Sequence, residues 1–133
     1  MKRILVAYDG GEPAQRALRT AIDLAKKFGG LIGVVSVIPF HPGRSPIDPW
    51  DDQTVHTKEL ADARAILLEE GIEADFIEPY GDPAQTIERI ADEGGYDTVV
   101  IGSRGLGAVS RLFRGSVSEH VATHAATTVV VAR

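Results

Sequence analysis

The chain of 133 residues contains no cysteine. Disulfide frameworks, thiolate metal sites and cysteine nucleophiles are therefore excluded. It also lacks any apolar run approaching the roughly 20 residues that span a bilayer. The apolar stretch after Lys2 and Arg3 stops at Asp9, within about five residues, which is too short for the core of a signal peptide. We therefore expect a cytoplasmic protein that does not act at a membrane.

Positive charge is also scarce. The sequence has 14 lysines and arginines against 19 aspartates and glutamates, which gives a formal net charge of −5. This balance argues against a domain that holds nucleic acid on a wide basic face. Hydrophobic residues make up 44% of the chain and charged residues 25%, as in an ordinary folded domain. The length predicts one domain over residues 1–133.

Apolar runs alternate with amphipathic segments along the whole chain. Strands are predicted over residues 4–8, 31–38, 72–80, 98–101 and 128–132. Helices are predicted over 13–28, around 60–67, from the cap Asp82 to Gly94 and over 116–125, with a proline-bearing loop at 39–53. This alternation predicts an α/β fold with one doubly wound parallel sheet and helices on both faces. Ligands of such sheets bind outside the carboxyl ends of the strands, where the winding reverses.

A glycine-bearing loop follows the fourth predicted strand and leads into the last helix. Gly102, Gly105, Gly115 and Ser116 give it the spacing G-x2-G-x9-G-S. Glycines let backbone N–H groups approach an anion closely, and a helix N-terminus adds partial positive charge. The loop also carries three of the chain's cations, Arg104, Arg111 and Arg114. The pattern predicts a site for phosphate or a nucleotide.

Simpler interpretations stay open at this point. The glycines could merely turn the chain, and Ser116 with Glu119 could form a capping box. Asp9 could orient a ribose hydroxyl or a bound Mg²⁺, or only close an Asp-Gly turn. The sequence has no Walker-type loop, no nucleophile elbow and no evident general base. We therefore expect no dedicated catalytic activity and at most slow ATP hydrolysis.

The loop spacing resembles the ATP-binding signature of the universal stress protein (UspA) family. Residues 4–10 resemble that family's first strand and acidic turn, residues 81–84 and 97–105 its second half, and residues 115–119 its last helix. The resemblance covers essentially the whole chain. It implies an adenine nucleotide alpha hydrolase-like fold with five strands in the order 3-2-1-4-5. It also implies a homodimer that binds ATP, with Mg²⁺, between the ends of strands one and four.

The resemblance also implies which residues would meet the adenosine part of the nucleotide. Ala7, Tyr8 and Asp9 would border adenine and ribose, and Val37 would line the adenine pocket. Apart from the resemblance, we expect the Mg²⁺ that accompanies the nucleotide to bind near Asp9. The chain departs from the family pattern at residues 125–128, which lead into the last strand, and at two positions near this part of the site. Tyr8 is bulkier than usual, so it would narrow the adenine mouth or stack on the base, and Gly11 replaces a frequent serine.

The remaining implied contacts fall in the glycine loop. Those expected at ribose and phosphates are Gly102, Arg104 and Gly105. Those expected at the β- and γ-phosphates, partly through backbone N–H groups, are Gly115, Ser116, Val117 and Ser118.

These observations predict an ATP-binding stress protein that works as a nucleotide-occupied regulatory module. Two alternatives remain: an enzyme of the same fold that slowly transfers phosphoryl or adenylyl groups, and a dimeric interaction protein with a vestigial loop. The last strand, 128–132, is apolar and β-branched and lacks the charge or proline that blunts exposed sheet edges. We expect it to pair with its own copy in a homodimer, unless residues 39–53 or a helix cover that edge.

Overall fold

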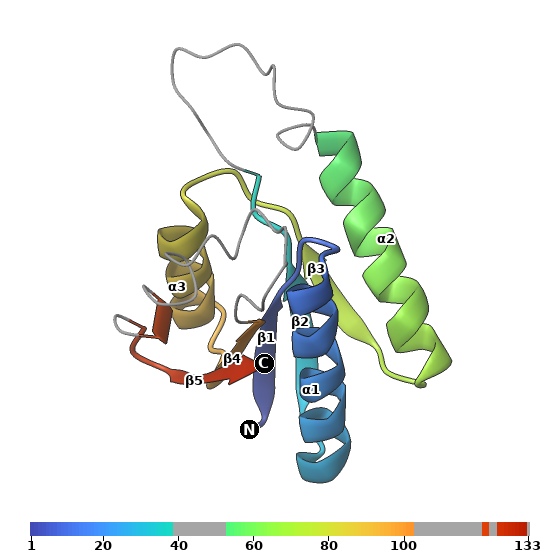
Figure 1. Ribbon diagram of the computed structural model, residues 1–133. Helices are drawn as coiled ribbons and strands as arrows, with labels where there is room; N and C mark the ends of the chain where they lie inside the picture. Colours follow the sequence, from blue (N-terminus) through green and yellow to red (C-terminus); the bar gives the residue numbers. More distant parts are fainter. Residues whose placement is uncertain (39–52, 103–120, 123–124, 133) are drawn as a thin grey trace, which may run out of the picture.

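Five parallel strands form a single sheet in the order β3-β2-β1-β4-β5 (Figure 1). The computed structural model describes residues 1–38, 53–102, 121–122 and 125–132, and the structural statements below concern these residues. Its elements, in chain order, are β1 (Arg3–Ala7), α1 (Glu12–Phe28), β2 (Leu31–Val35), α2 (Gln53–Glu69), β3 (Ala74–Ile77), α3 (Pro83–Glu93), β4 (Thr98–Gly102) and β5 (Thr128–Ala132).

The direction of winding reverses between β1 and β4. From β1 the chain moves outward through β2 to β3, and it then returns to place β4 on the other side of β1. Right-handed crossovers put the helices of the two halves on opposite faces. Accordingly, α1 and α2 cover one face of the sheet and α3 lies on the other (Figure 1). The predicted α/β fold and the strand order that the resemblance implied are both confirmed.

Local sequence signals set where the helices start and stop. At the start of α3, the Gln85 N–H donates a hydrogen bond of 3.1 Å to Asp82 Oδ2, and Pro83 occupies the first helical position. These are the N-cap and N1 preferences expected from the sequence. At the end of α1, Gly29 adopts a left-handed conformation with φ of 71°, and its N–H donates to the Ala25 carbonyl. A glycine meets that backbone requirement at little cost.

The core lies between the sheet and its helices, with β1 at its centre. Ile4, Leu5, Val6 and Ala7 are fully buried, as expected of a central strand covered on both faces. The residues that α1 turns toward the sheet share small or aliphatic side chains: Ala14, Ala17, Leu18, Ala21, Ile22 and Ala25. Fully burying a large aliphatic side chain such as Leu18 or Ile22 contributes about 1.5–3 kcal/mol, so this layer holds α1 against the sheet.

Strands two and three are shorter than predicted. The regular ladder ends at Val35 and Ile77, although residues 31–38 and 72–80 were expected to be extended throughout. The two segments nevertheless continue side by side, since the Ser36 N–H donates to the Ile77 carbonyl at 2.9 Å and Ile38 forms an isolated bridge with Tyr80. Pro79 has no N–H to return a bond to Ser36, and this gap interrupts the ladder.

Candidate functional site

The carboxyl ends of the central strands bring several predicted site residues to one edge of the sheet. The strand register places Ala7 beside Val35 and Val6 beside Val100. Asp9 and Val37 follow Ala7 and Val35 by two residues each, and Gly102 is the last residue of β4. This is the point at which the winding reverses, where ligands of doubly wound sheets bind. Val37 is 2% exposed and belongs to the core.

The other predicted site residues lie outside the described part of the chain. They are Arg104, Gly105, Gly115, Ser116, Val117 and Ser118. Their assignments therefore stay predictions, as does the capping box of Ser116 and Glu119.

Asp9 closes a tight turn immediately after β1. The Gly11 N–H donates a 2.9 Å hydrogen bond to Asp9 Oδ1, and Gly10 between them has φ of 81°. Such a bond to the backbone two residues on is an Asx-turn, and the positive φ suits glycine. The turn interpretation of Asp9 is thus confirmed, and it holds a buried carboxylate at the strand end. Its role toward ribose or Mg²⁺ stays a prediction.

Gly102 has a structural reason to be glycine that does not involve a ligand. A Cβ added there would stand 2.5 Å from the carbonyl carbon of Pro13 and 2.8 Å from its Cβ. Real Cβ atoms essentially never come within 3.0 Å of such neighbours. The end of β4 therefore packs directly on the first turn of α1, and the missing side chain allows that approach.

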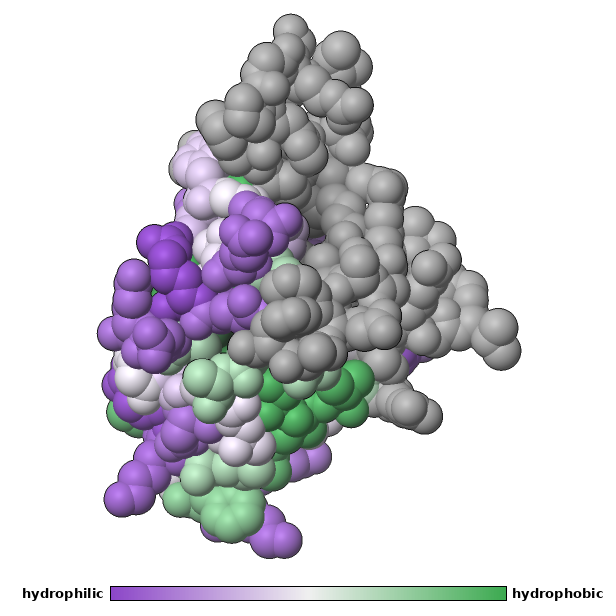
Figure 2. All heavy atoms as spheres, turned by 90° about the vertical axis from the view of Figure 1, so that its left-hand side faces the viewer, coloured by the Kyte–Doolittle hydropathy of each residue, from purple (hydrophilic) through white to green (hydrophobic). Residues whose placement is uncertain are grey.

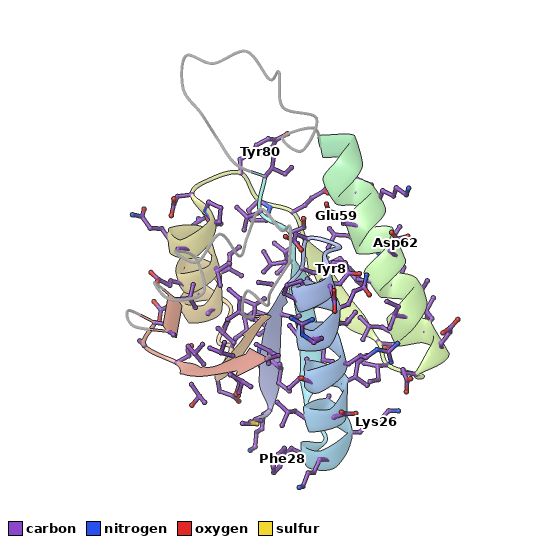
Figure 3. The ribbon with its side chains drawn as sticks, viewed as in Figure 1. Tyr8, Lys26, Phe28, Glu59, Asp62 and Tyr80 are labelled. Carbon is purple, nitrogen blue, oxygen red and sulfur yellow. The ribbon has the colours of Figure 1, made fainter. Side chains whose placement is uncertain are left out.

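Tyr8, directly after β1, has a buried side chain. The side chain is 2% exposed, and Figure 3 shows it between the sheet and α2, on the side where α2 carries Glu59 and Asp62. Burial, followed by the negative charges of Asp62, Asp9 and Glu59, raises the pKa of the phenol. The hydroxyl is therefore neutral at physiological pH. The ring fills the layer beneath α2, so it offers no open surface for stacking on a base.

Two residues at this edge were not found from the sequence. The hydroxyl of Ser36, just beyond β2, donates a 3.1 Å hydrogen bond to Glu59 Oε2. Ser36 is fully buried and Glu59 is 8% exposed. One signal could have indicated Glu59, because it stands four residues before Ala63 and eight before Leu67, on the stripe that α2 buries. A carboxylate on a buried helical stripe needs a partner inside the protein.

Acidic groups dominate the described residues of this edge, but they do not form a metal site. Within residues 1–38, 53–102 and the short described segments that follow, no three His, Asp or Glu side chains lie close enough together to hold a metal ion. A Mg²⁺ ion that enters with a nucleotide takes most of its ligands from phosphate oxygens and water, with one or two carboxylates from the protein. Asp9 is the described residue that fits this role.

A separate groove among the described residues lies away from this edge. It has a volume of about 410 Å³ and lies at the opposite end of the strands, between the last turns of α2 and the beginnings of β2 and β3. Its walls are mostly apolar, with Leu31, Leu67 and Phe76 among them. None of the described site residues lines it, so the groove is not the nucleotide site that the sequence predicts.

The fold and this edge define a doubly wound α/β protein with a candidate site where β1 and β4 end. The sequence matches the model of the universal stress protein family over residues 1–133. The chain therefore belongs to the universal stress protein family.

Individual relatives agree with this assignment. The chain is 33% identical to a universal stress protein of Thermus aquaticus, encoded in the QAH/OAS sulfhydrylase 3′ region, over 99% of this chain and 98% of that protein. A solved universal stress protein from Archaeoglobus fulgidus is 28% identical and superimposes with a TM-score of 0.81, covering 100% of this chain and 99% of its own. A further structure from that organism, in complex with dAMP, is 27% identical with a TM-score of 0.77 and covers 100% and 98%.

The helices were also compared in length and hydropathy with what a bilayer requires. None of the helices in the described ranges is both long enough and apolar enough to cross a bilayer.

Proposed function

We propose that this protein binds ATP, together with Mg²⁺, and acts as a nucleotide-occupied regulatory module in the stress response. The observation that carries the proposal is the juxtaposition of the Asp9 turn with Gly102, where the glycine-serine segment leaves β4. Both lie at the reversal of the winding. The complex of the related Archaeoglobus fulgidus protein with dAMP supports an adenine nucleotide as the ligand.

The charges at this edge favour one orientation of the nucleotide. Asp9 and Glu59 are buried carboxylates close to the end of β1. Carboxylates accept hydrogen bonds from ribose hydroxyls but repel phosphates at short range. Adenosine would therefore lie against Ala7, Asp9 and Val37, which follows β2. The phosphates would extend toward the segment that begins at Gly102, where the sequence places its arginines and the serine at the start of the last helix.

We propose no dedicated catalytic step. The groups that we assign to the site would bind and orient a nucleotide, while the sequence lacks the motifs of a phosphoryl- or adenylyl-transfer enzyme. Slow hydrolysis of bound ATP is compatible with this function. Release of ADP or AMP in a single turnover, at a rate well above background, would instead favour the transferase alternative.

The proposal includes a cytoplasmic homodimer built on β5. This strand lies at the edge of the sheet and is paired on one side with β4. Val131 is 39% exposed, and Val129 and Val130 are partly buried. Figure 2 shows an apolar patch on the face of the molecule that includes this edge, below the hydrophilic surface of α3. Antiparallel pairing of β5 with its copy about a two-fold axis would satisfy the backbone groups of both edges.

Calorimetric titration with ATP and Mg²⁺ tests the nucleotide assignment. We expect micromolar binding by the parent protein and loss of binding in Gly115→Val, because the added side chain would stand where a phosphate must approach. Gly107→Val is the matched control, since Gly107 lies in the same segment but outside the signature spacing. Equal affinity of parent and Gly115→Val would show that the phosphate assignment is wrong. Absence of binding in the parent would favour the vestigial-loop alternative.

A further inference from the structure

Glu59 is an unusual residue for its place in the fold. Together with Asp9 it is one of the two carboxylates that are buried among the described residues, at 8% exposure each. Both lie at the edge where β1 ends, and both contribute to the raised pKa of Tyr8. An aliphatic side chain at position 59 would pack without the cost of desolvating a carboxylate. A carboxylate retained there needs an explanation beyond the stability of the core.

The side chain of Glu59 bridges the ends of two neighbouring strands. Its stem lies against the Asp9 turn, with Cγ 3.3 Å from the point where a Cβ of Gly10 would stand. Its Oε2 atom accepts the 3.1 Å hydrogen bond from Ser36, just beyond β2. Figure 3 shows Glu59 directed from α2 toward this edge of the sheet. A single side chain thus connects α2 to the turn after β1 and to the end of β2.

The turn needs such support because it contains two successive glycines. Gly10 and Gly11 can adopt many conformations, and ordering them on ligand binding would cost free energy. The Asx hydrogen bond restricts the turn from within. The stem of Glu59 restricts it from the side of α2. A turn held in place before the ligand arrives binds more tightly than one ordered by the ligand.

We propose that Glu59 is a positioning residue for the nucleotide. It does not touch the ligand but holds the Asp9–Gly11 turn, and with it the Asp9 carboxylate, in the binding conformation. The proposal rests on the proposed function of adenine nucleotide binding. It assigns to α2 a part in the site that the glycine signature, which lies wholly in residues 102–116, does not include.

Calorimetric titration of a double-mutant cycle with ATP and Mg²⁺ tests this role. We expect Asp9→Ala and Glu59→Ala each to weaken binding roughly tenfold. Because Glu59 acts through Asp9, the double variant should be within a factor of two of Asp9→Ala alone. Glu59→Gln keeps the stem and an acceptor for Ser36, so it should stay within about threefold of the parent. Glu69→Ala, at an exposed position of the same helix, is the matched control and should bind like the parent.

Two outcomes of the titration would overturn the proposal. One is an affinity of Glu59→Ala within a factor of two of the parent. The other is a double variant whose loss equals the product of the single losses, as expected if Glu59 affected binding independently of Asp9. Should Glu59→Ala fail to fold, Ser36→Ala removes the same hydrogen bond more mildly. It should weaken binding severalfold, and an unchanged affinity would count against the proposal.

Hydrogen exchange in the absence of nucleotide separates this proposal from the proposed function. If Glu59 holds the turn, the Gly11 N–H should exchange at least several times faster in Glu59→Ala than in Glu69→Ala. Equal exchange rates would overturn the positioning role, whatever the nucleotide data show. Faster exchange in Glu59→Ala, combined with a parent protein that binds no nucleotide, would confirm the support of the turn while refuting the nucleotide function.

Discussion

The close approach of β4 to α1 at Gly102 makes a sharp prediction about an alanine substitution. Gly102 is not among the glycines with positive φ, so its backbone conformation is available to alanine. Replacing such a glycine normally stabilises a protein by about 0.4–1 kcal/mol, because the unfolded chain loses freedom. Without a steric conflict, Gly102→Ala should therefore be more stable than the parent.

The contacts at Gly102 predict the opposite sign. The added Cβ would stand 2.5 Å from the Pro13 carbonyl carbon and 2.8 Å from the Pro13 Cβ. These atoms belong to the backbone and ring of the first turn of α1, so no side-chain rotation relieves the conflict. Overpacking of this kind costs about 1–3 kcal/mol. After subtraction of the entropic gain, we expect Gly102→Ala to lower the free energy of unfolding by about 1–2 kcal/mol.

Denaturant unfolding of the nucleotide-free protein measures this difference directly. The midpoint should fall without a change in slope, and the melting temperature should fall by several degrees. Gly102→Val should be less stable still, since its two methyl groups must be accommodated as well. A Gly102→Ala protein at least as stable as the parent would refute the packing argument and leave ligand contact as the reason for this glycine.

Two other predictions concern the sheet edge and the amino-terminal end of β1. Val131→Lys should shift the protein from dimer to monomer in sedimentation equilibrium. Leu68→Lys places the same charge at another exposed aliphatic position, on α2, and should not shift it. A parent that is monomeric at micromolar concentration would exclude the dimer. At Asp97, desolvation acts to raise the pKa, but hydrogen bonds from Thr98 and from the backbone N–H groups of Lys2 and Arg3 outweigh it and lower the pKa below its ordinary 3.8. The stabilisation is therefore present above that ordinary pKa and lost as pH falls through the lower pKa of the folded protein. Asp97→Asn should be less stable than the parent at pH 7, and its melting temperature should fall less steeply below pH 4. Parallel melting curves over that range would contradict this origin of acid sensitivity.

The fold was predictable because its signals are local. The cap at Asp82 with Pro83 placed the start of α3, and the apolar run 128–132 gave the bounds of β5 without error. Strand ends were less predictable because burial and pairing are different properties. Val37 and Ile38 are buried as the apolar pattern suggests, yet the ladder stops at Val35. The reason is Pro79, which lies on the neighbouring segment and has no N–H to donate.

The candidate site was predictable only in part, because its support comes from residues far apart in the sequence. The glycine spacing that begins at Gly102 predicts a phosphate loop. The packing of that glycine, however, depends on Pro13, in the first turn of α1 and far away in the sequence. The same residue thus answers a packing requirement that the motif does not contain. Likewise, Glu59 meets Ser36 and Gly10 only after α2 has docked on the sheet. A motif identifies groups that can touch a ligand, whereas the residues that hold those groups in place are determined by the tertiary fold.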